Sequence, residues 1–191
     1  VFQRTPNYTV PARNAPLNPE EVKEIKANYT ALRARAKRTP MGIDWPMPTL
    51  LAVETDPQDR IEEYESRWKK GGTGFLASFK DLLVDKNAND TAANFVRQKI
   101  QETVHDHKTA ELLSPDNVIG CKRLCVDTGY WETFNRPNVS LIDVSRTPIE
   151  TISELDPGSL DCCGLSSGSI RNGVRHHPGG FGSLRGDSTR L

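Results

Sequence analysis

Two neighbouring cations, Lys122 and Arg123, stand between apolar residues in the stretch GCKRLCVDTGYWETFNRPNV, residues 120–139. Cations in an apolar setting cost desolvation free energy unless an anion meets them. The pair therefore raises the question of which anion two adjacent and different cations would meet there. The residues leave one alternative open, a solvated strand edge that needs no ligand.

A second candidate lies in the opening VFQRTP, where a strand-like run ends in Arg4 and Thr5. In a dinucleotide-binding βαβ unit the second strand ends beside the adenosine ribose. An acidic residue there holds the ribose 2′-hydroxyl of NAD, whereas an arginine accepts the 2′-phosphate of NADP. The run contains no Asp or Glu, so it favours a 2′-phosphate. Because many strands end in arginine, the motif is weak by itself.

Three other patterns are better explained by structure than by chemistry. GGTG, residues 71–74, lacks the Gly-Lys-Ser/Thr ending of a phosphate loop and follows no strand, so it predicts a helix cap and turn. His105 and His107 flank Asp106, a predicted helix cap, and are expected at the surface. The cysteines have no zinc-like spacing, so we expect no metal site and reduced thiols at Cys121, Cys125, Cys162 and Cys163.

The elements that must position the candidate residues alternate between strands and helices. VFQR predicts a strand end, and a proline-punctuated loop follows over residues 5–16. Asn18, Pro19 and Glu21 then form a helix start. Helical spacing of apolar residues predicts one helix from there to Ala36 and others over residues 57–70, 75–83 and 92–104, whose aromatic side chains are expected in the core. Strand-like texture returns after residue 118, with strands predicted in VSLIDV and TPIETIS.

The last part of the chain has a different composition. Eight of the fourteen glycines lie between Gly158 and Gly186, interleaved with serine and arginine. Neither strand alternation nor helical periodicity is sustained there, and such a segment buries little apolar area. We therefore expect residues 154–191 to be disordered.

Overall composition excludes several classes of partner. The chain has 191 residues, with 25 Lys and Arg against 25 Asp and Glu. This balance provides no general attraction to nucleic acid or to an anionic membrane surface. No run approaches 18 apolar residues and the start has no signal-peptide pattern, so we expect no membrane partner and a cytoplasmic location. The first residue is Val1 rather than Met, which predicts a segment of a longer protein.

Taken together, the motifs resemble the Baeyer–Villiger flavin monooxygenases of the phenylacetone and cyclohexanone monooxygenase type. Four stretches carry the resemblance: VFQRTPNYTVPARNAPL (1–17), FKDLLVDKNANDTAANFVRQKI (79–100), GCKRLCVDTGYWETFNRPNVSLIDV (120–144) and TPIETI (147–152). The resemblance covers about residues 1–153, and the ordered combination is far more specific than any one motif.

The resemblance implies an α/β fold: part of a Rossmann-like NADP-binding domain with a helical insertion, mostly helical in the portion present. Residues 1–17 would be the end of an NADP-domain strand and its loop. Residues 18–118 would be the helical insertion, and residues 119–153 the return to the NADP domain. Residues 154–191 would be a disordered or out-of-frame tail, because the family continues there into a buried strand that this chain lacks.

The resemblance also implies residue roles. Arg4 and Thr5 would bind the adenosine 2′-phosphate of NADP, and Lys122 the same phosphate from the other side. Arg123 would be the catalytic arginine, which stabilises negative charge developing near the flavin during oxygen transfer. The implied reaction uses FAD, NADPH and O2 to convert a small-molecule ketone to an ester or lactone. Alternatives are a related flavin monooxygenase that oxygenates nitrogen or sulfur, and a non-catalytic truncated product.

A second departure from the family, in addition to the missing strand after Ile152, bears on what the chain does alone. The glycine-rich phosphate loops of the FAD and NADP domains, and the family fingerprint F-x-G-x-x-x-H-x-x-x-W, lie upstream of VFQR in the family and are missing. Helix N-termini in such loops hold the pyrophosphates of dinucleotides. We therefore expect the isolated chain to bind neither FAD nor NADP tightly and to be inactive.

Overall fold

The computed structural model describes residues 1–39, 42–44, 47–145, 149–152 and 163–165. They fall into two compact units, Val1–Arg146 and Thr147–Leu191.

In the second unit, β5 (Ile149–Ile152) pairs antiparallel with β6 (Cys163–Leu165). The TPIETIS strand is thereby confirmed. The rest of the segment expected to be disordered, including Cys162, lies outside the described residues. Sequence patterning missed β6 because backbone pairing over three residues requires no side-chain alternation.

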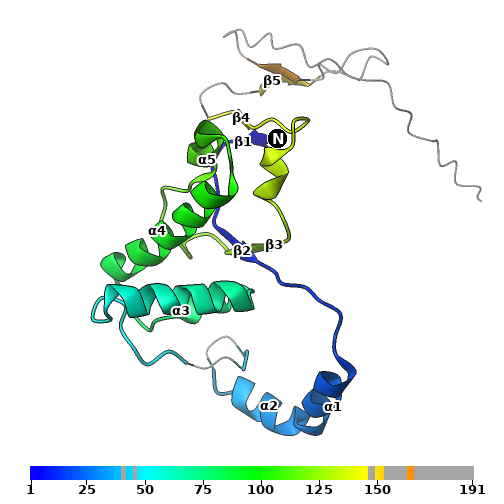
Figure 1. Cartoon of the computed structure of the whole chain (residues 1–191), viewed down its shortest axis with the longest axis vertical. Coiled ribbons are helices and arrows are strands. Elements are labelled where there is room, and N and C mark those ends of the chain that lie inside the picture. The colour runs from blue at the N-terminus through cyan, green and yellow to red at the C-terminus, as the bar shows by residue number, and fades with distance from the viewer. Residues whose placement is uncertain (40–41, 45–46, 146–148, 153–162, 166–191) are drawn as a thin grey trace, which may run out of the picture. The chain divides into compact units, whose positions relative to one another are not determined.

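Four short strands of the first unit form two parallel pairs. β1 (Phe2–Gln3) pairs with β4 (Ile142–Asp143), and β2 (Thr9–Pro11) pairs with β3 (Cys125–Asp127). Both pairs join the start of the chain to a segment that follows the helices, as Figure 1 shows. The strands predicted in VFQR and VSLIDV are confirmed, each with two residues. Parallel strands need a long crossover, and here the helices provide it.

Strand β2 lies inside residues 5–16, which the sequence predicted as a loop, and this prediction is wrong at Thr9–Pro11. The prolines do not prevent pairing, because Pro11 is the last residue of the strand. The next residue, Ala12, already donates its backbone N–H to Asp127 O at 2.8 Å. With only three residues, β2 shows too little strand-like pattern in the sequence to be recognised among the prolines around it.

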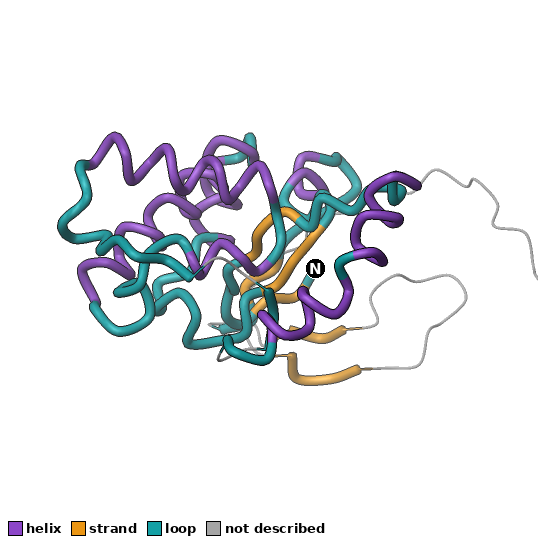
Figure 2. Tube along the Cα trace, turned by 90° about the horizontal axis from the view of Figure 1, so that it is seen from below, coloured by secondary structure: helices purple, strands orange, loops and turns teal. Residues whose placement is uncertain are grey.

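The described residues form five α-helices, and little of their trace is strand (Figure 2). None of these helices is long and apolar enough to cross a membrane. Three of them begin at the predicted capping residues: Asn18 accepts from Glu20 N, Asp56 from Gln58 N and Asp106 from Thr109 N. The bounds are α1 (Pro19–Ala27), α2 (Tyr29–Ala36), α3 (Pro57–Lys70), α4 (Lys86–Thr103) and α5 (His107–Leu113).

Two helix predictions need correction. The single helix expected up to Ala36 is broken at Asn28, whose backbone N and side-chain Nδ2 both donate to Glu24 O, at 3.0 and 3.1 Å. A short amide side chain that competes for a backbone carbonyl favours a break. The helix expected over residues 75–83 is a 3-10 helix, η1 (Thr73–Ala77), followed by turns. There the buried Asp81 carboxylate accepts from Ala52 N at 2.8 Å.

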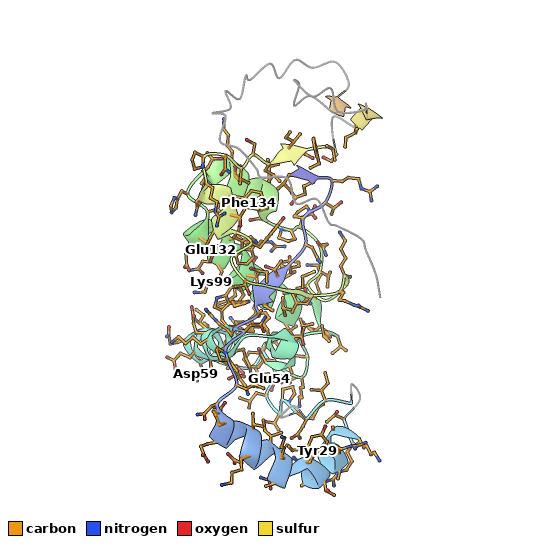
Figure 3. All side chains as sticks on the ribbon, turned by 90° about the vertical axis from the view of Figure 1, so that its right-hand side faces the viewer. Tyr29, Glu54, Asp59, Lys99, Glu132 and Phe134 are labelled. Atoms are coloured by element: carbon orange, nitrogen blue, oxygen red, sulfur yellow. The ribbon has the colours of Figure 1, made fainter. Side chains whose placement is uncertain are left out.

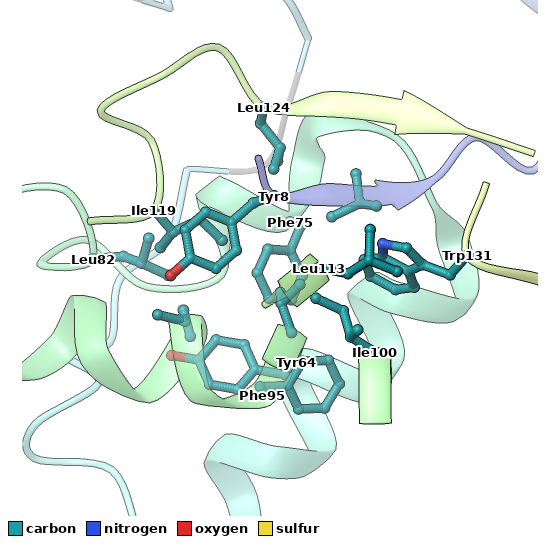
Figure 4. Packing of buried hydrophobic residues seen from close by; sticks show 14 of the residues in the cluster. Tyr8, Tyr64, Phe75, Leu82, Phe95, Ile100, Leu113, Ile119, Leu124 and Trp131 are labelled. Carbon is teal, nitrogen blue, oxygen red and sulfur yellow. The ribbon is translucent and has the colours of Figure 1, made fainter. Parts of the chain in front are cut away.

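The core of the first unit is aromatic and centres on Tyr64 of α3, which is 1% exposed (Figure 4). Its ring centroid lies 5.4 Å from those of Phe75, Phe79 and Phe95. Its hydroxyl is 2.8 Å from Thr91 Oγ1. Burial raises the pKa of Tyr64. The predicted role of these aromatic residues as core is confirmed.

Tyr8, immediately before β2, ties the start of the chain to α4. It is 1% exposed, and its hydroxyl donates to Asn117 O at 2.7 Å. Arg97 of α4 donates from Nη2 to the same hydroxyl at 2.9 Å. Burial raises the pKa of Tyr8, while the Arg97 guanidinium opposes that rise. This network fixes the segment between Arg4, Thr5 and strand β2.

Helices α1 and α2 contact each other and bury none of their residues. Tyr29 at the start of α2 is 54% exposed (Figure 3). By contrast, Lys99 of α4 reaches Glu65 Oε1 of α3 at 2.5 Å and lies 5.2 Å from the Phe95 ring centroid. The tightly packed part of the helical segment is therefore α3 to α5.

The GGTG stretch ends α3, as predicted, and supplies no phosphate loop. Gly71 has φ 76° and ψ 179°, and its N–H donates to Arg67 O at 2.9 Å. A Cβ on Gly71 would lie 2.6 Å from Pro11 O and 2.4 Å from Arg13 Cγ. Only glycine accepts both this backbone conformation and this close approach.

Gly71→Ala is expected to lower the free energy of unfolding by about 2–3 kcal/mol, because strain at a glycine-only conformation adds to the clash with a backbone oxygen. Gly42→Ala is the matched control. Gly42 also has positive φ, but a Cβ there meets nothing within 4 Å. Urea unfolding of both variants measures the difference, and equal losses would contradict a steric role for Pro11 O.

Candidate functional site

A surface pocket of about 610 Å³ lies where the first residues of the chain meet residues 122–130. Arg4, Thr5 and Lys122 line it together. These are three of the four site residues predicted from the sequence, and the structure brings them to one place although they lie far apart in the chain.

Pairing of β2 with β3 creates this pocket. Thr9 is in register with Cys125, and Cys125 N donates to Tyr8 O at 3.3 Å. Just outside the strands, Asn7 Nδ2 donates to Arg123 O at 3.0 Å and to Cys125 Sγ at 3.3 Å. The segments that carry Arg4 and Lys122 are therefore held side by side by backbone and side-chain bonds.

Arg123, the predicted catalytic residue, does not line the pocket. It is exposed, and within the described part of the chain its guanidinium has no hydrogen-bond or ion-pair partner. The next residue, Leu124, is 6% exposed and belongs to the core. The structure thus separates the two neighbouring cations, with Lys122 in the pocket and Arg123 outside it.

The charge of the pocket is positive overall but not uniformly so. Arg4 and Lys122 are exposed cations, and Asp127 is the one acidic side chain of the lining. Asp127 Oδ1 accepts from Tyr130 N at 2.9 Å, which ties this oxygen to the turn after β3. Burial raises the pKa of Tyr130, and the nearby Asp127 charge raises it further. The phenol therefore stays neutral and can donate a hydrogen bond.

The donor set of the pocket fits a phosphate monoester. Two cations and the Thr5 hydroxyl supply the donors that a phosphate dianion requires. In addition, Thr9, which also lines the pocket and is 7% exposed, has a buried Oγ1 that meets no hydrogen-bond partner among the described residues. Most buried hydroxyls in folded proteins are paired, so this one is an exception in the pocket wall.

Other candidate positions do not form a second chemical site. His105 and His107 are exposed, as predicted, and His107 Nδ1 lies 3.4 Å from Glu111 Oε1. Cys121 and Cys125 are exposed free thiols. No group of three or more metal-ligating side chains occurs among residues that the structure describes. A separate pocket of about 510 Å³ contains none of the predicted site residues; Met47, Leu50, Asp59, Glu62 and Glu63 contribute to its lining.

Sequence reasoning missed Asn7, Thr9 and Cys125 as parts of the pocket. No spacing or composition signal marks Asn7. Thr9 and Cys125 become neighbours only through the β2–β3 register, so a sequence argument would have needed to recognise β2 inside a proline-rich segment.

Comparisons with known proteins agree with this arrangement, although no protein-family model matches the chain. Cyclohexanone 1,2-monooxygenase of Acinetobacter sp is 38% identical over 157 residues, which cover 81% of this chain and 28% of that protein. A phenazine N-monooxygenase of Lysobacter antibioticus is 30% identical over 155 residues, which cover 80% of this chain and 28% of that protein. A solved structure, an oxidized steroid monooxygenase bound to NADP, is 40% identical with a TM-score of 0.80, covering 87% of this chain and 31% of that chain.

Each match includes most of this chain, whereas the chain spans only 28% of the two curated relatives and 31% of the solved structure. Sequence identity and three-dimensional similarity both select flavin monooxygenases of this group, and each does so over most of this chain. The chain belongs to the Baeyer–Villiger flavin monooxygenases, of which it represents one segment.

Proposed function

We propose that this chain forms the adenosine 2′-phosphate site of a Baeyer–Villiger monooxygenase that uses FAD, NADPH and O2 to convert a ketone to an ester or lactone. The observation that carries the proposal is the convergence of Arg4, Thr5 and Lys122 on one pocket. In the proposed protein, residues 1–17 and 119–153 belong to a Rossmann-like NADP-binding domain, and residues 18–118 form its helical insertion. Small-molecule partners and a cytoplasmic location are part of this proposal.

Within this site, Arg4 and Lys122 neutralise the 2′-phosphate and Thr5 donates a hydrogen bond to it. Arginine supplies a planar pair of donors and lysine a mobile ammonium, so the two residues complement each other around one phosphate. When bound, NADPH supplies a hydride, and FAD with O2 supplies the oxygen atom that is transferred. Binding of the adenosine end fixes the direction in which the nicotinamide end of the nucleotide extends.

Arg123 has a different role in the proposal. Its guanidinium is exposed and without a partner among the described residues, so it is available to meet charge that arises outside the pocket. We assign it to the negative charge that develops on oxygen atoms during transfer to the ketone. A cation that meets this charge only as it develops stabilises the transition state more than the ground state.

The second candidate is oxygenation of nitrogen instead of a ketone. The 30% identity to a phenazine N-monooxygenase supports it, because that relative covers 80% of this chain. Both candidates require the same nucleotide site, so the pocket residues do not separate them. The two candidates are separated by measuring the rate at which the complete enzyme oxygenates a ketone and an aromatic nitrogen compound.

The nucleotide site itself is tested with adenosine 2′,5′-bisphosphate and 5′-AMP as probes, because they differ only in the 2′-phosphate. We expect the bisphosphate to bind the chain at least about tenfold more tightly, since hydrogen bonds to charged groups contribute about 1.5–3 kcal/mol. Lys122→Ala should remove most of this difference. Chemical-shift titration of the folded chain measures both affinities.

Lys108→Ala is the matched control, because Lys108 is an exposed lysine of α5 that does not line the pocket. It should leave the preference for the bisphosphate unchanged. Equal affinities of the two probes for the unmodified chain would refute the 2′-phosphate site.

A further inference from the structure

The segment that carries Lys122 and Arg123 is neither helix nor strand, yet asparagine side chains hold both of its ends. At the first end, Asn89 of α4 is 2% exposed and pairs with Ile119. Its Nδ2 donates to Ile119 O at 2.9 Å and its Oδ1 accepts from Ile119 N at 3.0 Å. The same Nδ2 donates to Leu82 O at 3.0 Å. This end is therefore fixed to the core of the helical segment.

At the second end, Asn7, which precedes β2, links its segment to Arg123 and to the first residue of β3. Its Nδ2 donates to Arg123 O at 3.0 Å and to Cys125 Sγ at 3.3 Å. Asn7 follows Arg4 and Thr5 by three and two positions and lines the same pocket. It is thus the direct side-chain link between the two halves of the cationic site.

The backbone from Ile119 to Leu124, which the two asparagine side chains hold at its ends, has little freedom to move as a whole. Ile119 is fully buried and Leu124 is 6% exposed, so the apolar flanks are held in the core. Between these flanks, rotation of the peptide groups at Lys122 and Arg123 would change which of the two cations faces the pocket. The bond from Asn7 Nδ2 to the Arg123 carbonyl opposes such a rotation.

We propose that Asn7 is a positioning residue that keeps Lys122 directed into the 2′-phosphate pocket and Arg123 outside it. The inference rests on the proposed function, because it concerns the same nucleotide site. Asn7 acts through the Arg123 backbone and needs no contact with the nucleotide. Its removal should therefore weaken recognition of the 2′-phosphate while leaving the remainder of the nucleotide unaffected.

The test uses Asn7→Ala in the full chain, with adenosine 2′,5′-bisphosphate and 5′-AMP as probes. We expect bisphosphate binding to weaken about threefold to tenfold, the factor that one hydrogen bond contributes, and 5′-AMP binding to stay unchanged. The backbone amides of Lys122 and Arg123 should show increased mobility in nuclear magnetic relaxation. Asn7→Gln retains the amide donor and should recover part of the lost affinity.

Asn14→Ala is the matched control, because Asn14 is an exposed asparagine that follows β2 and does not line the pocket. If Asn7→Ala weakens both probes equally, or leaves both unchanged, the positioning role is overturned. Failure of Lys122→Ala to affect binding refutes the nucleotide site itself, whereas an effect of Lys122→Ala without one of Asn7→Ala refutes only the positioning role. Unfolding in urea shows whether Asn7→Ala folds, and a variant that does not fold also overturns the proposal in favour of a structural role.

Discussion

Replacing Arg123 by alanine is expected to reduce ketone oxygenation at least about 100-fold, the loss that follows removal of one transition-state charge partner. The experiment uses a chimeric enzyme in which residues 1–145 replace the matching segment of cyclohexanone 1,2-monooxygenase. Because Arg123 lies outside the pocket that holds Lys122, the affinity for NADPH should change little. The lactone yield reports oxygen transfer, and the dependence of NADPH consumption on NADPH concentration reports nucleotide affinity. Measuring both separates a loss of oxygen transfer from a loss of NADPH binding.

The unmodified chimera provides the reference, and Arg136→Ala is a matched control, because Arg136 is exposed and does not line the pocket. Lys122→Ala in the same chimera should show the opposite pattern, with a raised KM for NADPH and a smaller change in kcat. If Arg123→Ala raises only the KM for NADPH, its assignment to oxygen transfer is wrong and it belongs to the nucleotide site.

The largest loss of stability is expected for Tyr64→Ala, about 3–5 kcal/mol. Tyr64 is 1% exposed and packs against three phenylalanine rings, so its removal leaves a cavity that the surrounding rings cannot close. Such a loss is a large part of the 5–15 kcal/mol that stabilises a typical domain. The shift of the urea unfolding midpoint measures it.

Two variants show whether packing or hydrogen bonding dominates at Tyr64. Tyr64→Phe removes only the hydroxyl, whose neighbour Thr91 Oγ1 also donates to Ala88 O, so the cost should be about 1 kcal/mol. Tyr29→Ala removes an exposed ring of the same type and should cost less than about 0.5 kcal/mol. A loss for Tyr64→Phe as large as that for Tyr64→Ala would show that the hydroxyl is the dominant contribution.

Local signals in the sequence predicted the helices well where capping was explicit. Asn18, Asp56 and Asp106 each start a helix, and Gly71 ends one, because these residues satisfy backbone groups at helix ends through their own chemistry. The break at Asn28 and the buried carboxylate of Asp81 were not predictable in this way. Both depend on which of several possible hydrogen bonds a polar side chain makes in the folded chain.

Three residues of the candidate pocket, Arg4, Thr5 and Lys122, were singled out from the sequence, but the geometry of the pocket was not predictable. The motifs around Arg4 and Lys122 indicated one shared anion only through resemblance to a family. Their actual proximity depends on the pairing of β2 with β3, a non-local contact between short strands. Asn7 escaped prediction for the same reason, since its partner, the Arg123 carbonyl, is a backbone atom with no sequence signature.

The parallel pairing of β2 with β3 also bears on when the pocket that contains Arg4 and Lys122 can form. Asn7 and Cys125 are 118 positions apart, and closing a flexible loop of that length costs about 4 kcal/mol of chain entropy in addition to a constant term. Contacts across such distances slow folding, because the entropy is lost before the contacts compensate for it. Helices that form before the strands pair would shorten the effective loop. We therefore expect the pocket to assemble late in folding, after the helical segment.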